Sequence, residues 1–436
     1  MKQDFKLSRR RLLGAGTALS AFTLAGCATG TATGTATGPS IGRVVIVGGG
    51  FGGATAARYL KMWGGNIDVT LVERNATFVS CPMSNLVLGG HAQMAGITRS
   101  YSGLQALGVK RVQGDVTAVD AAAKTVRLAN GQVLPYDRLI LSPGVDFMLD
   151  STAGLAAALD SGRVLHGWKA GPQTVALRQQ LQAMPDGGVF AMSIPKVPYR
   201  CPPGPYERAC MVASYFKQYK PRSKVLVLDA NPEVQSKKAL FEKAFKDHYS
   251  GLLEYRPNNE LKEVMVGNAG QLTAKLEFDD VKADVLNVIP PQRGSDIARS
   301  AGLLNMNSRW AGVNWLTMES TAAAGIHVLG DATFSAPAMP KSGHMANQHA
   351  KVAAAAIIEL LQGRAVSAAP VVMNTCYSFV TATDVVHVAS VHQYDSVDKT
   401  FKTVPGSGGV SAAASALEGR YAQSWADNIW ADMLAG

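Results

Sequence analysis

Short apolar runs that end at glycine or at an acidic residue recur along the chain and predict buried strands. Residues 43–47 form such a run and lead directly into the glycine-rich segment 48–53, and a second run at 67–72 ends at Glu73. Continuous apolar runs of this length are typical of strands that are covered on both faces. The alanine-rich stretch 54–62 between them has helical composition. Strand, helix and strand in this order predict a dinucleotide-binding βαβ unit.

The strand pattern returns in the middle of the chain, and a different pattern marks its end. Apolar runs at 188–192 and 224–228 predict two strands of a second Rossmann-like half. Near the C-terminus, residues 384–390 alternate as in a half-exposed strand, and the last residues form a helical stretch with Trp425 and Trp430. The predicted fold class is therefore α/β, with two Rossmann-like domains and a C-terminal α+β domain.

Composition excludes several classes of protein. The chain has 436 residues, of which 47% are hydrophobic and 17% charged, which excludes a disordered chain. Five cysteines exclude a small disulfide-framed scaffold, and neither CxxC nor HxxxH spacing occurs, so we expect no metal site. The net charge is +10, but the body of the chain has no Lys/Arg run, so we expect no nucleic-acid partner.

The N-terminus has the features of an export signal. The basic segment 8–11 precedes an apolar stretch, 12–26, that is too short to span a bilayer well. The twin arginines resemble a Tat signal, which exports proteins already folded around a cofactor, and a Sec signal is the alternative. Residues 24–27 resemble a lipobox in which Cys27 would carry a lipid anchor, with simple cleavage near Ala28 as the alternative. We therefore expect a periplasmic protein whose mature body is soluble.

The segment 48–53 is a GxGxxG fingerprint in its proper context of strand, turn and helix. Gly48 permits the tight turn, Gly50 lets the backbone approach a pyrophosphate, and Gly53 lets helix and strand pack closely. Glu73 ends the next predicted strand, where an acidic side chain accepts the ribose hydroxyls. The expected contacts of the dinucleotide are Gly48, Gly50, Phe51, Gly52, Gly53, Glu73 and Arg74.

Two later segments favour FAD over NAD as the dinucleotide. Residues 136–144, and residues 321–331 with their terminal Gly-Asp, resemble the FAD signatures of flavoproteins that have two dinucleotide-binding domains. By that resemblance Asp331 binds the ribityl chain, and the alternative is a helix N-cap. A helix predicted to begin near residue 340 would direct its positive end at the flavin. Further candidate contacts of FAD are Val116, Ser142, Gly144, Asp331, Lys341, Ser342 and Gly343.

The second Rossmann-like half has no glycine fingerprint. Its first strand is followed by a proline-rich loop, and proline has no N–H to offer a phosphate. We therefore predict that the NAD site is lost and that a small reductant reaches the flavin directly. The predicted organisation is a signal and tether at 1–40, an FAD-binding domain at 41–150 and 305–365, a second Rossmann-like domain at 151–304, and a C-terminal interface domain at 366–436.

The cysteines are the candidates for the chemistry. Cys210 lies in an apolar helical stretch and is expected to be buried and inert. Cys201 precedes that helix beside Arg200, so we expect a lowered thiol pKa and a reactive group. Cys376 lies far along the chain, and oxidising export allows the two to pair. A structural disulfide and two free thiols remain the alternatives.

Five segments carry a further resemblance: CPMSN at 81–85, WKAGPQT at 168–174, PYRCPPGPYERA at 198–209, PKSG at 340–343 and NTCYS at 374–378. Together they resemble the flavoprotein subunit of flavocytochrome c sulfide dehydrogenase. The resemblance implies that Cys81 carries FAD through a thioether, that Cys201 and Cys376 form a redox disulfide beside the flavin, and that Glu207 is the acid/base. Glu207 as a helix-terminus charge is the alternative. His344 and Met345 depart from the family pattern.

The resemblance implies oxidation of sulfide, with electrons passing through FAD to a c-type cytochrome subunit. The chain has no CxxCH, so the haem is expected on another polypeptide. One alternative is a sulfide:quinone oxidoreductase, which would favour an apolar amphipathic C-terminal helix with basic flanks, whereas residues 411–436 are rich in Ala and Ser. Another is a non-catalytic flavoprotein that reactivates a sulfur-oxidation complex.

Overall fold

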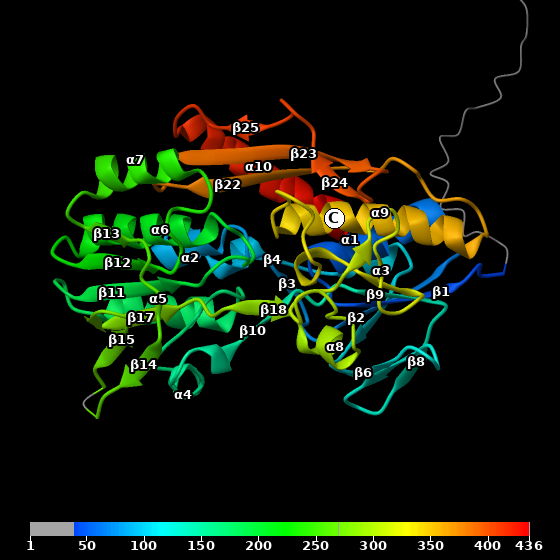
Figure 1. The fold of residues 1–436 in the computed structure, drawn as a ribbon, viewed down its shortest axis with the longest axis horizontal. Coiled ribbons are helices and arrows are strands. Elements are labelled where there is room, and N and C mark those ends of the chain that lie inside the picture. The colour runs from blue at the N-terminus through cyan, green and yellow to red at the C-terminus, as the bar shows by residue number, and fades with distance from the viewer. Residues whose placement is uncertain (1–38, 269, 436) are drawn as a thin grey trace, which may run out of the picture. The chain divides into compact units, whose positions relative to one another are not determined.

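A computed structural model describes residues 39–268 and 270–435. Its largest sheet has the strand order β19-β20-β21-β9-β1-β2-β5, with a parallel centre and an antiparallel edge at β19 and β20. Figure 1 labels β9, β1 and β2 of this sheet. The first and last parts of this sheet are far apart in the sequence. Its strands are β1 (Arg43–Val47), β2 (Asp68–Glu73), β5 (Lys110–Gln113), β9 (Arg138–Leu141), β19 (Val313–Asn314), β20 (Glu319–Ser320) and β21 (Ile326–Val328).

Two helices pack against each other over this sheet, namely α1 (Phe51–Gly64) and α9 (Gly343–Leu361). Leu60 and Ile357 are fully buried in the core that they share. The opposite face of the sheet packs on an antiparallel meander through a second apolar cluster, so both faces are covered, as a parallel sheet requires. The meander consists of β6 (Val116–Asp120), β7 (Thr125–Leu128) and β8 (Val133–Pro135).

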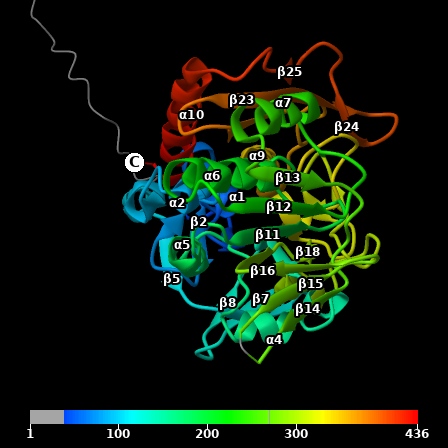
Figure 2. The same cartoon turned by 90° about the vertical axis from the view of Figure 1, so that its left-hand side faces the viewer.

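The middle of the chain forms a second parallel sheet, of order β13-β12-β11-β17 (Figures 1 and 2). Helix α6 contacts β12 and β13, whereas α5 contacts β17. A three-stranded antiparallel sheet lies beside it. The elements are α5 (Pro172–Ala183), β11 (Val189–Ile194), α6 (Gly204–Tyr219), β12 (Lys224–Asp229), α7 (Lys238–Tyr249), β13 (Leu253–Arg256), β14 (Glu263–Val266), β15 (Leu272–Lys275), β16 (Asp280–Ala283) and β17 (Val285–Val288).

The C-terminal part is an antiparallel sheet with one long helix. Strand β22 (Val371–Phe379) pairs with β23 (Val385–Asp395), and β23 also pairs with β24 (Thr400–Thr403) and β25 (Gly409–Val410). Helix α10 (Ala416–Leu434) packs on α1, β22 and β23. The remaining elements are β3 (Phe78–Val79), α2 (Ser84–Gly89), β4 (Thr98–Arg99), α3 (Ser102–Ala106), β10 (Val145–Phe147), α4 (Leu155–Asp160), β18 (Gln292–Gly294), α8 (Asp296–Ser300), and 3-10 turns at Met94–Ile97, Leu149–Ser151 and Gly330–Ala332.

The predicted α/β fold class is confirmed, and the predicted strand at 43–47 has those bounds. Helix α1 begins at Phe51, three residues before the predicted start at 54. Glycine has low helix propensity, so the sequence pattern did not include Gly52 and Gly53 in the helix. The export motifs and Cys27 lie outside the described residues. No helix in 39–268 or 270–435 has the length and hydropathy needed to cross a bilayer.

Candidate functional site

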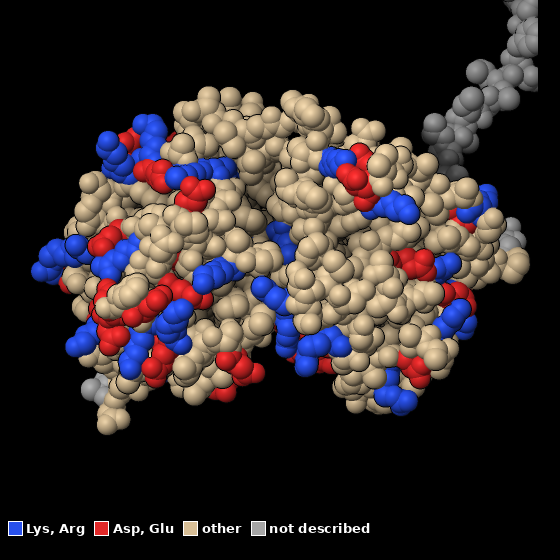
Figure 3. Space-filling view, viewed as in Figure 1, with Lys and Arg blue, Asp and Glu red and all other residues tan. Residues whose placement is uncertain are grey.

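A cavity of about 770 Å³ is lined by residues from all three parts of the fold. The molecular face drawn in Figure 3 is hollowed near its middle, and Lys and Arg side chains lie beside the hollow. Of the predicted site residues, only Gly53 does not line the cavity. Those that do are Gly48, Gly50, Phe51, Gly52, Glu73, Arg74, Cys81, Val116, Ser142, Gly144, Cys201, Glu207, Asp331, Lys341, Ser342, Gly343 and Cys376.

The glycine fingerprint forms a tight turn because side chains have no room there. Gly48 has a φ of +97°, and a Cβ on it would lie 2.4 Å from the carbonyl oxygen of Ser142. A Cβ on Gly53 would lie 1.8 Å from the carbonyl oxygen of Gly48, so position 53 has no room for a side chain. Glu73 accepts a hydrogen bond of 2.7 Å from the backbone N–H of Gly49, which fixes the second strand against the turn.

The cavity has the polar groups and the space that FAD requires. A Cβ on Gly50 would meet no protein atom within 4 Å, so the backbone there is open to a ligand. Asp331 Oδ1, Ser295 Oγ and Trp168 Nε1 are buried without hydrogen-bond partners in the described part of the chain, although their residues line the cavity. Buried polar atoms normally have partners, so these atoms fit contacts to a bound group. The residues present therefore fit FAD.

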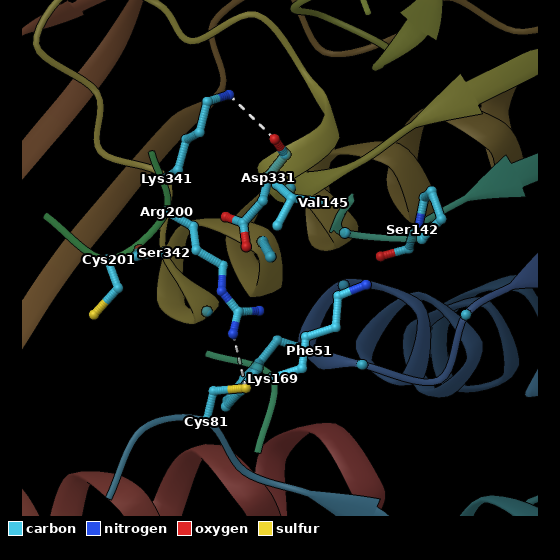
Figure 4. A pocket seen from close by; sticks show the side chains of 18 of the residues that line it. Phe51, Cys81, Ser142, Val145, Lys169, Arg200, Cys201, Asp331, Lys341 and Ser342 are labelled. Atoms are coloured by element: carbon cyan, nitrogen blue, oxygen red, sulfur yellow. Dashed lines mark hydrogen bonds between the residues drawn. The ribbon is translucent and has the colours of Figure 1, made fainter. Parts of the chain in front are cut away.

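Asp331 lies in a 3-10 turn at the end of β21, and its orphaned Oδ1 shows that this oxygen does not cap a helix. Burial raises the pKa of Asp331, while Arg200 and Lys341 oppose the rise. Lys341 donates to the carbonyl oxygen of Asp331 at 3.1 Å and to that of Thr333 (Figure 4). Two cations therefore act on the carboxyl group of Asp331 in the cavity wall.

Ser342 caps α9 by accepting a hydrogen bond of 3.0 Å from the N–H of Met345, and it donates to Asn374 on β22 at 2.6 Å. These bonds join the start of α9 to the strand that carries Cys376. The start of α9, with Gly343 against the ring of Phe51, thereby forms part of the cavity wall as predicted.

Cys81 is held by donors from two other loops. Nη2 of Arg200 lies 3.2 Å from the Cys81 sulfur, and the N–H of Ala170 lies 3.4 Å from it. Arg200 also donates to the carbonyl oxygen of Trp168, and Figure 4 shows its guanidinium directed at Cys81. The sequence placed Arg200 beside Cys201, but it could not show that the side chain turns away to a different cysteine.

Cys201 and Cys376 line the same cavity, and the structure has both as free thiols. Burial raises the pKa of Cys201, Cys376 and Glu207 raise it further, and Arg200 and Lys237 only partly oppose this. The predicted lowering of the Cys201 pKa was therefore wrong, because burial outweighs the neighbouring cations. Burial also raises the pKa of Cys376. Cys210 is fully buried, as predicted.

Glu207 lies in the first turn of α6 and is almost completely buried. One carboxylate oxygen accepts from the amide of Asn85 at 2.7 Å, and the other from the N–H of Phe379 at 2.9 Å. Arg208 donates to the oxygen of the same Asn85 amide at 3.1 Å, which fixes the orientation of that amide. Burial raises the pKa of Glu207, with these donors and Lys237 opposing the rise. Glu207 thus bridges α2, α6 and β22 beside the two thiols.

Sequence reasoning missed several residues of the site. His344, which in the sequence was only a departure from the family pattern, lines the cavity, accepts from the N–H of Thr375 at 3.0 Å, and packs edge-on against Trp425 with ring centroids 5.8 Å apart. Ser295 and Lys237 belong to no motif, so no signal in the sequence could have found them. Within the described ranges, no group of three or more His, Cys, Asp or Glu side chains could hold a metal ion.

Three family models match successive parts of the chain. They are pyridine nucleotide-disulphide oxidoreductase at residues 42–172, the central part of the sulfide dehydrogenase (flavocytochrome c) flavoprotein chain at 174–290, and the flavin-binding part of flavocytochrome c sulphide dehydrogenase at 368–434. A flavoprotein chain of sulfide dehydrogenase (flavocytochrome c) from Chlorobaculum thiosulfatiphilum is 60% identical over 45 residues, which are 10% of this chain and 94% of that sequence.

More distant relatives cover longer stretches. Mitochondrial sulfide:quinone oxidoreductase of Mus musculus is 22% identical over 307 residues, 66% of this chain and 65% of that protein. The crystal structure of sulfide:quinone oxidoreductase from Aquifex aeolicus aligns with a TM-score of 0.71 at 18% identity, over 90% of this chain and 91% of that one. A NAD-dependent persulfide reductase from A. fulgidus aligns with a TM-score of 0.63 at 15% identity, over 88% and 77%. These structural likenesses show the fold.

Proposed function

The chain belongs to the family of the flavocytochrome c sulfide dehydrogenase flavoprotein chain, and from that premise we propose that it oxidises sulfide through Cys201 and Cys376. FAD, when bound, would accept the electron pair and pass electrons on singly to a c-type cytochrome. The observation that carries the proposal is the position of the two thiols. They come from the β11–α6 loop and from β22, and both line the buried cavity that fits FAD.

The sulfur chemistry is thiol–disulfide exchange. In the oxidised protein Cys201 and Cys376 form a disulfide, and HS⁻ attacks one of its sulfurs. The S–S bond breaks, a new S–S bond forms to the incoming sulfur, and the other cysteine leaves as a thiolate with the electron pair. The product on the attacked residue is a persulfide. Glu207 accepts the remaining proton of the incoming sulfur, because its burial beside the thiols favours the protonated carboxyl.

The residues that would hold FAD follow from the cavity wall. The turn around Gly50 would hold the pyrophosphate, Glu73 the ribose, and Asp331 the ribityl chain. We assign the thioether to Cys81, whose sulfur accepts hydrogen bonds from Arg200 and Ala170. These two contacts would fix the position of the sulfur that forms the bond. Covalent attachment would retain the cofactor after export.

The proposed setting is the periplasm, reached through the Tat pathway, with a lipid at Cys27 as a further tether. The partner we propose is a separate c-type cytochrome subunit. A sulfide:quinone oxidoreductase is the second candidate, because relatives with that activity align with two thirds of this chain. Comparing the rates at which the purified protein reduces cytochrome c and a soluble quinone with sulfide as donor separates the two.

The test of the sulfur chemistry uses single cysteine substitutions. Cys201→Ser and Cys376→Ser should each abolish bleaching of the flavin spectrum by sulfide while FAD stays bound. Cys210→Ser is the matched control, because Cys210 is fully buried outside the cavity lining. Wild-type bleaching by either of the first two variants would contradict the proposed role of the pair.

A further inference from the structure

Lys237 is a buried lysine next to the strand that carries Cys376. It directly precedes α7, and only 7% of its surface is exposed. Its ammonium donates to the carbonyl oxygen of Cys376 at 3.0 Å, to the hydroxyl of Ser378 at 2.8 Å, and to the carbonyl oxygen of Val386 at 3.3 Å. The three bonds use all three N–H donors and hold the ammonium against β22 and β23.

The ammonium has no carboxylate partner of its own. Across residues 39–268 and 270–435, no acidic side chain lies within ion-pair distance of its nitrogen, although Glu207 and Glu418 act on it from farther away. The oxygens of Glu207 are bonded to Asn85 and Phe379, and Glu418 is bonded to Ser411 at 2.6 Å and to His387 at 3.0 Å. A buried charge without a counter-ion is unfavourable, so the site favours an additional anion beside Lys237.

The proposed sulfur exchange puts such an anion on Cys376 whichever sulfur is attacked. If HS⁻ attacks Cys201, the sulfur of Cys376 leaves as a thiolate. If HS⁻ attacks Cys376, that residue carries a persulfide, which ionises more readily than a thiol. Exchange is faster when the leaving thiol is more acidic, yet burial makes both thiols of this site less acidic. A fixed positive charge would offset that effect.

We propose that Lys237 supplies the counter-charge for an anionic sulfur on Cys376 and so acts as a positioning residue for the disulfide chemistry. The inference rests on the proposed function of the Cys201–Cys376 pair. Lys237 opposes the raised pKa of both thiols. Of the groups that lower the pKa of Cys376, Lys237 has the largest effect, whereas for Cys201 the effect of Arg200 is larger. Cys376 is therefore the thiol on which Lys237 acts most.

The effect has a defined dependence on pH. Burial lowers the pKa of Lys237 to about 8, against the opposing pull of Cys376 on β22, Glu207 on α6, Cys201 in the β11–α6 loop and Glu418 on α10. The counter-charge is present below that pH and is lost as the pH rises through it. Its contribution to the acidity of Cys376 should therefore be visible near neutral pH and fade in alkaline solution.

The test measures the thiols directly, in the holoenzyme reduced with a phosphine and without sulfide. Lys237→Gln keeps amide donors for the backbone carbonyls but removes the charge, and Lys237→Arg keeps the charge. Lys238→Gln is the matched control, because Lys238 is exposed and paired with Glu233 at 2.8 Å. The readouts are the rate at which iodoacetamide alkylates Cys376, followed by peptide mass spectrometry from pH 6 to 9, and the midpoint potential of the disulfide.

We expect Lys237→Gln to slow alkylation of Cys376 about tenfold at neutral pH, since one pKa unit is a tenfold change in thiolate. The midpoint potential of the disulfide should stay within about 30 mV of wild type at neutral pH, because both reduced thiols are protonated there and gain little from the charge. Lys237→Arg and Lys238→Gln should stay close to wild type. A lysine that only joined two strands would change the melting temperature without changing either readout.

A wild-type alkylation rate of Cys376 in Lys237→Gln would overturn the proposal, and so would a Lys237→Arg variant that behaves like Lys237→Gln. If Lys237→Gln does not fold, the wild-type protein provides the test. Cys376 should then be alkylated before Cys201, and the reverse order would overturn the proposal. Because no sulfide is added, a failure of sulfide oxidation can be distinguished from a failure of this inference.

Discussion

The guanidinium of Arg200 donates a hydrogen bond to the sulfur of Cys81 across 3.2 Å, although the neighbouring residue on its own loop is Cys201 (Figure 4). In this short loop Arg200 contacts Cys81, and the next residue, Cys201, contributes a thiol to the cavity. The loop is fixed at Cys201, whose N–H donates to the carbonyl oxygen of Lys341 at 2.8 Å. The site proposed for cofactor attachment and the proposed redox pair are thus mechanically connected.

The first prediction concerns this hydrogen bond. Arg200→Gln should slow covalent attachment of FAD at least about tenfold, because a hydrogen bond to a charged group contributes about 1.5–3 kcal/mol. The measurement is the yellow colour retained in acid-precipitated protein during reconstitution of apoprotein with FAD. Cys81→Ala should retain none, and Arg222→Gln, which alters an exposed ion pair with Asp186, should behave as wild type. Unchanged attachment in Arg200→Gln would show that the contact has no part in it.

The second prediction separates two glycines of the same turn. Gly53→Ala should lower the free energy of unfolding by about 1–3 kcal/mol, because its Cβ would overlap the carbonyl oxygen of Gly48. Gly50→Ala should change unfolding by less than about 1 kcal/mol, because it is an N-cap position whose Cβ meets no protein atom. Its Cβ would instead enter the cavity and weaken FAD binding. Urea unfolding of the apoprotein and FAD titration, both on a Cys81→Ala background, measure the two effects.

The pair of variants is its own control. If Gly50→Ala bound FAD with wild-type affinity, the pyrophosphate would not approach the backbone at Gly50. If Gly53→Ala unfolded like wild type, the turn would be able to relax, and the close contact with Gly48 would not limit stability.

The parts of the site that lie in local patterns could be predicted from the sequence. The strand, turn and helix around Gly48 and Gly53 are encoded within a few residues, and Asp331 lies in the turn that directly follows the short strand β21. The fold class follows from the same local patterns, because buried apolar runs alternating with helical stretches favour parallel sheets. The start of α1 was placed too late because glycine hides the first turn of a helix.

The parts that depend on packing between distant segments could not be predicted. Lys237 reaches β22 only because α7 is folded against the C-terminal sheet, and the direction of Arg200 depends on where Cys81 lies. The pKa of Cys201 shows the same limit, since proximity to a helix N-terminus and to Arg200 is visible in the sequence but burial is not. A sequence gives the neighbours along the chain, whereas the electrostatics of a buried group depend on neighbours in space.

The third prediction is a loss of stability in acid. Burial lowers the pKa of His349 to about 3, and its Nδ1 accepts a hydrogen bond of 3.2 Å from the N–H of Gly330, beside Asp331. In the unfolded chain the histidine pKa is near 6.5, so between about pH 3 and 6.5 the unfolded chain binds the proton more readily than the folded protein does. Stability should therefore rise with pH between about 3 and 6.5 and fall as the pH drops. His166 and His344, whose pKa values burial lowers to about 3 and about 4, act in the same direction.

His349→Gln keeps an acceptor for Gly330 but cannot take up the proton. It should reduce the slope of unfolding free energy against pH by up to about 1.4 kcal/mol per unit between pH 6 and 4. His248→Gln, at a partly exposed position on α7, is the control. A slope equal to that of wild type in His349→Gln would mean that another group accounts for the loss in acid.

The fourth prediction concerns Glu207, which must accept two hydrogen bonds where it lies. Glu207→Gln would place an amide N–H₂ against either the N–H of Phe379 or the amide donor of Asn85, and Arg208 prevents Asn85 from turning over. The variant should therefore lose stability by about 1–3 kcal/mol, as expected when a buried donor loses its acceptor.

Glu207→Gln should also slow flavin bleaching by sulfide roughly 100-fold, the lower end of the range for a general acid or base, while FAD content is unchanged. Thermal melting and stopped-flow absorbance measure the two effects, with the exposed Glu242→Gln on α7 as the control. If Glu207→Gln loses stability but bleaches at the wild-type rate, Glu207 holds α2, α6 and β22 together and transfers no proton.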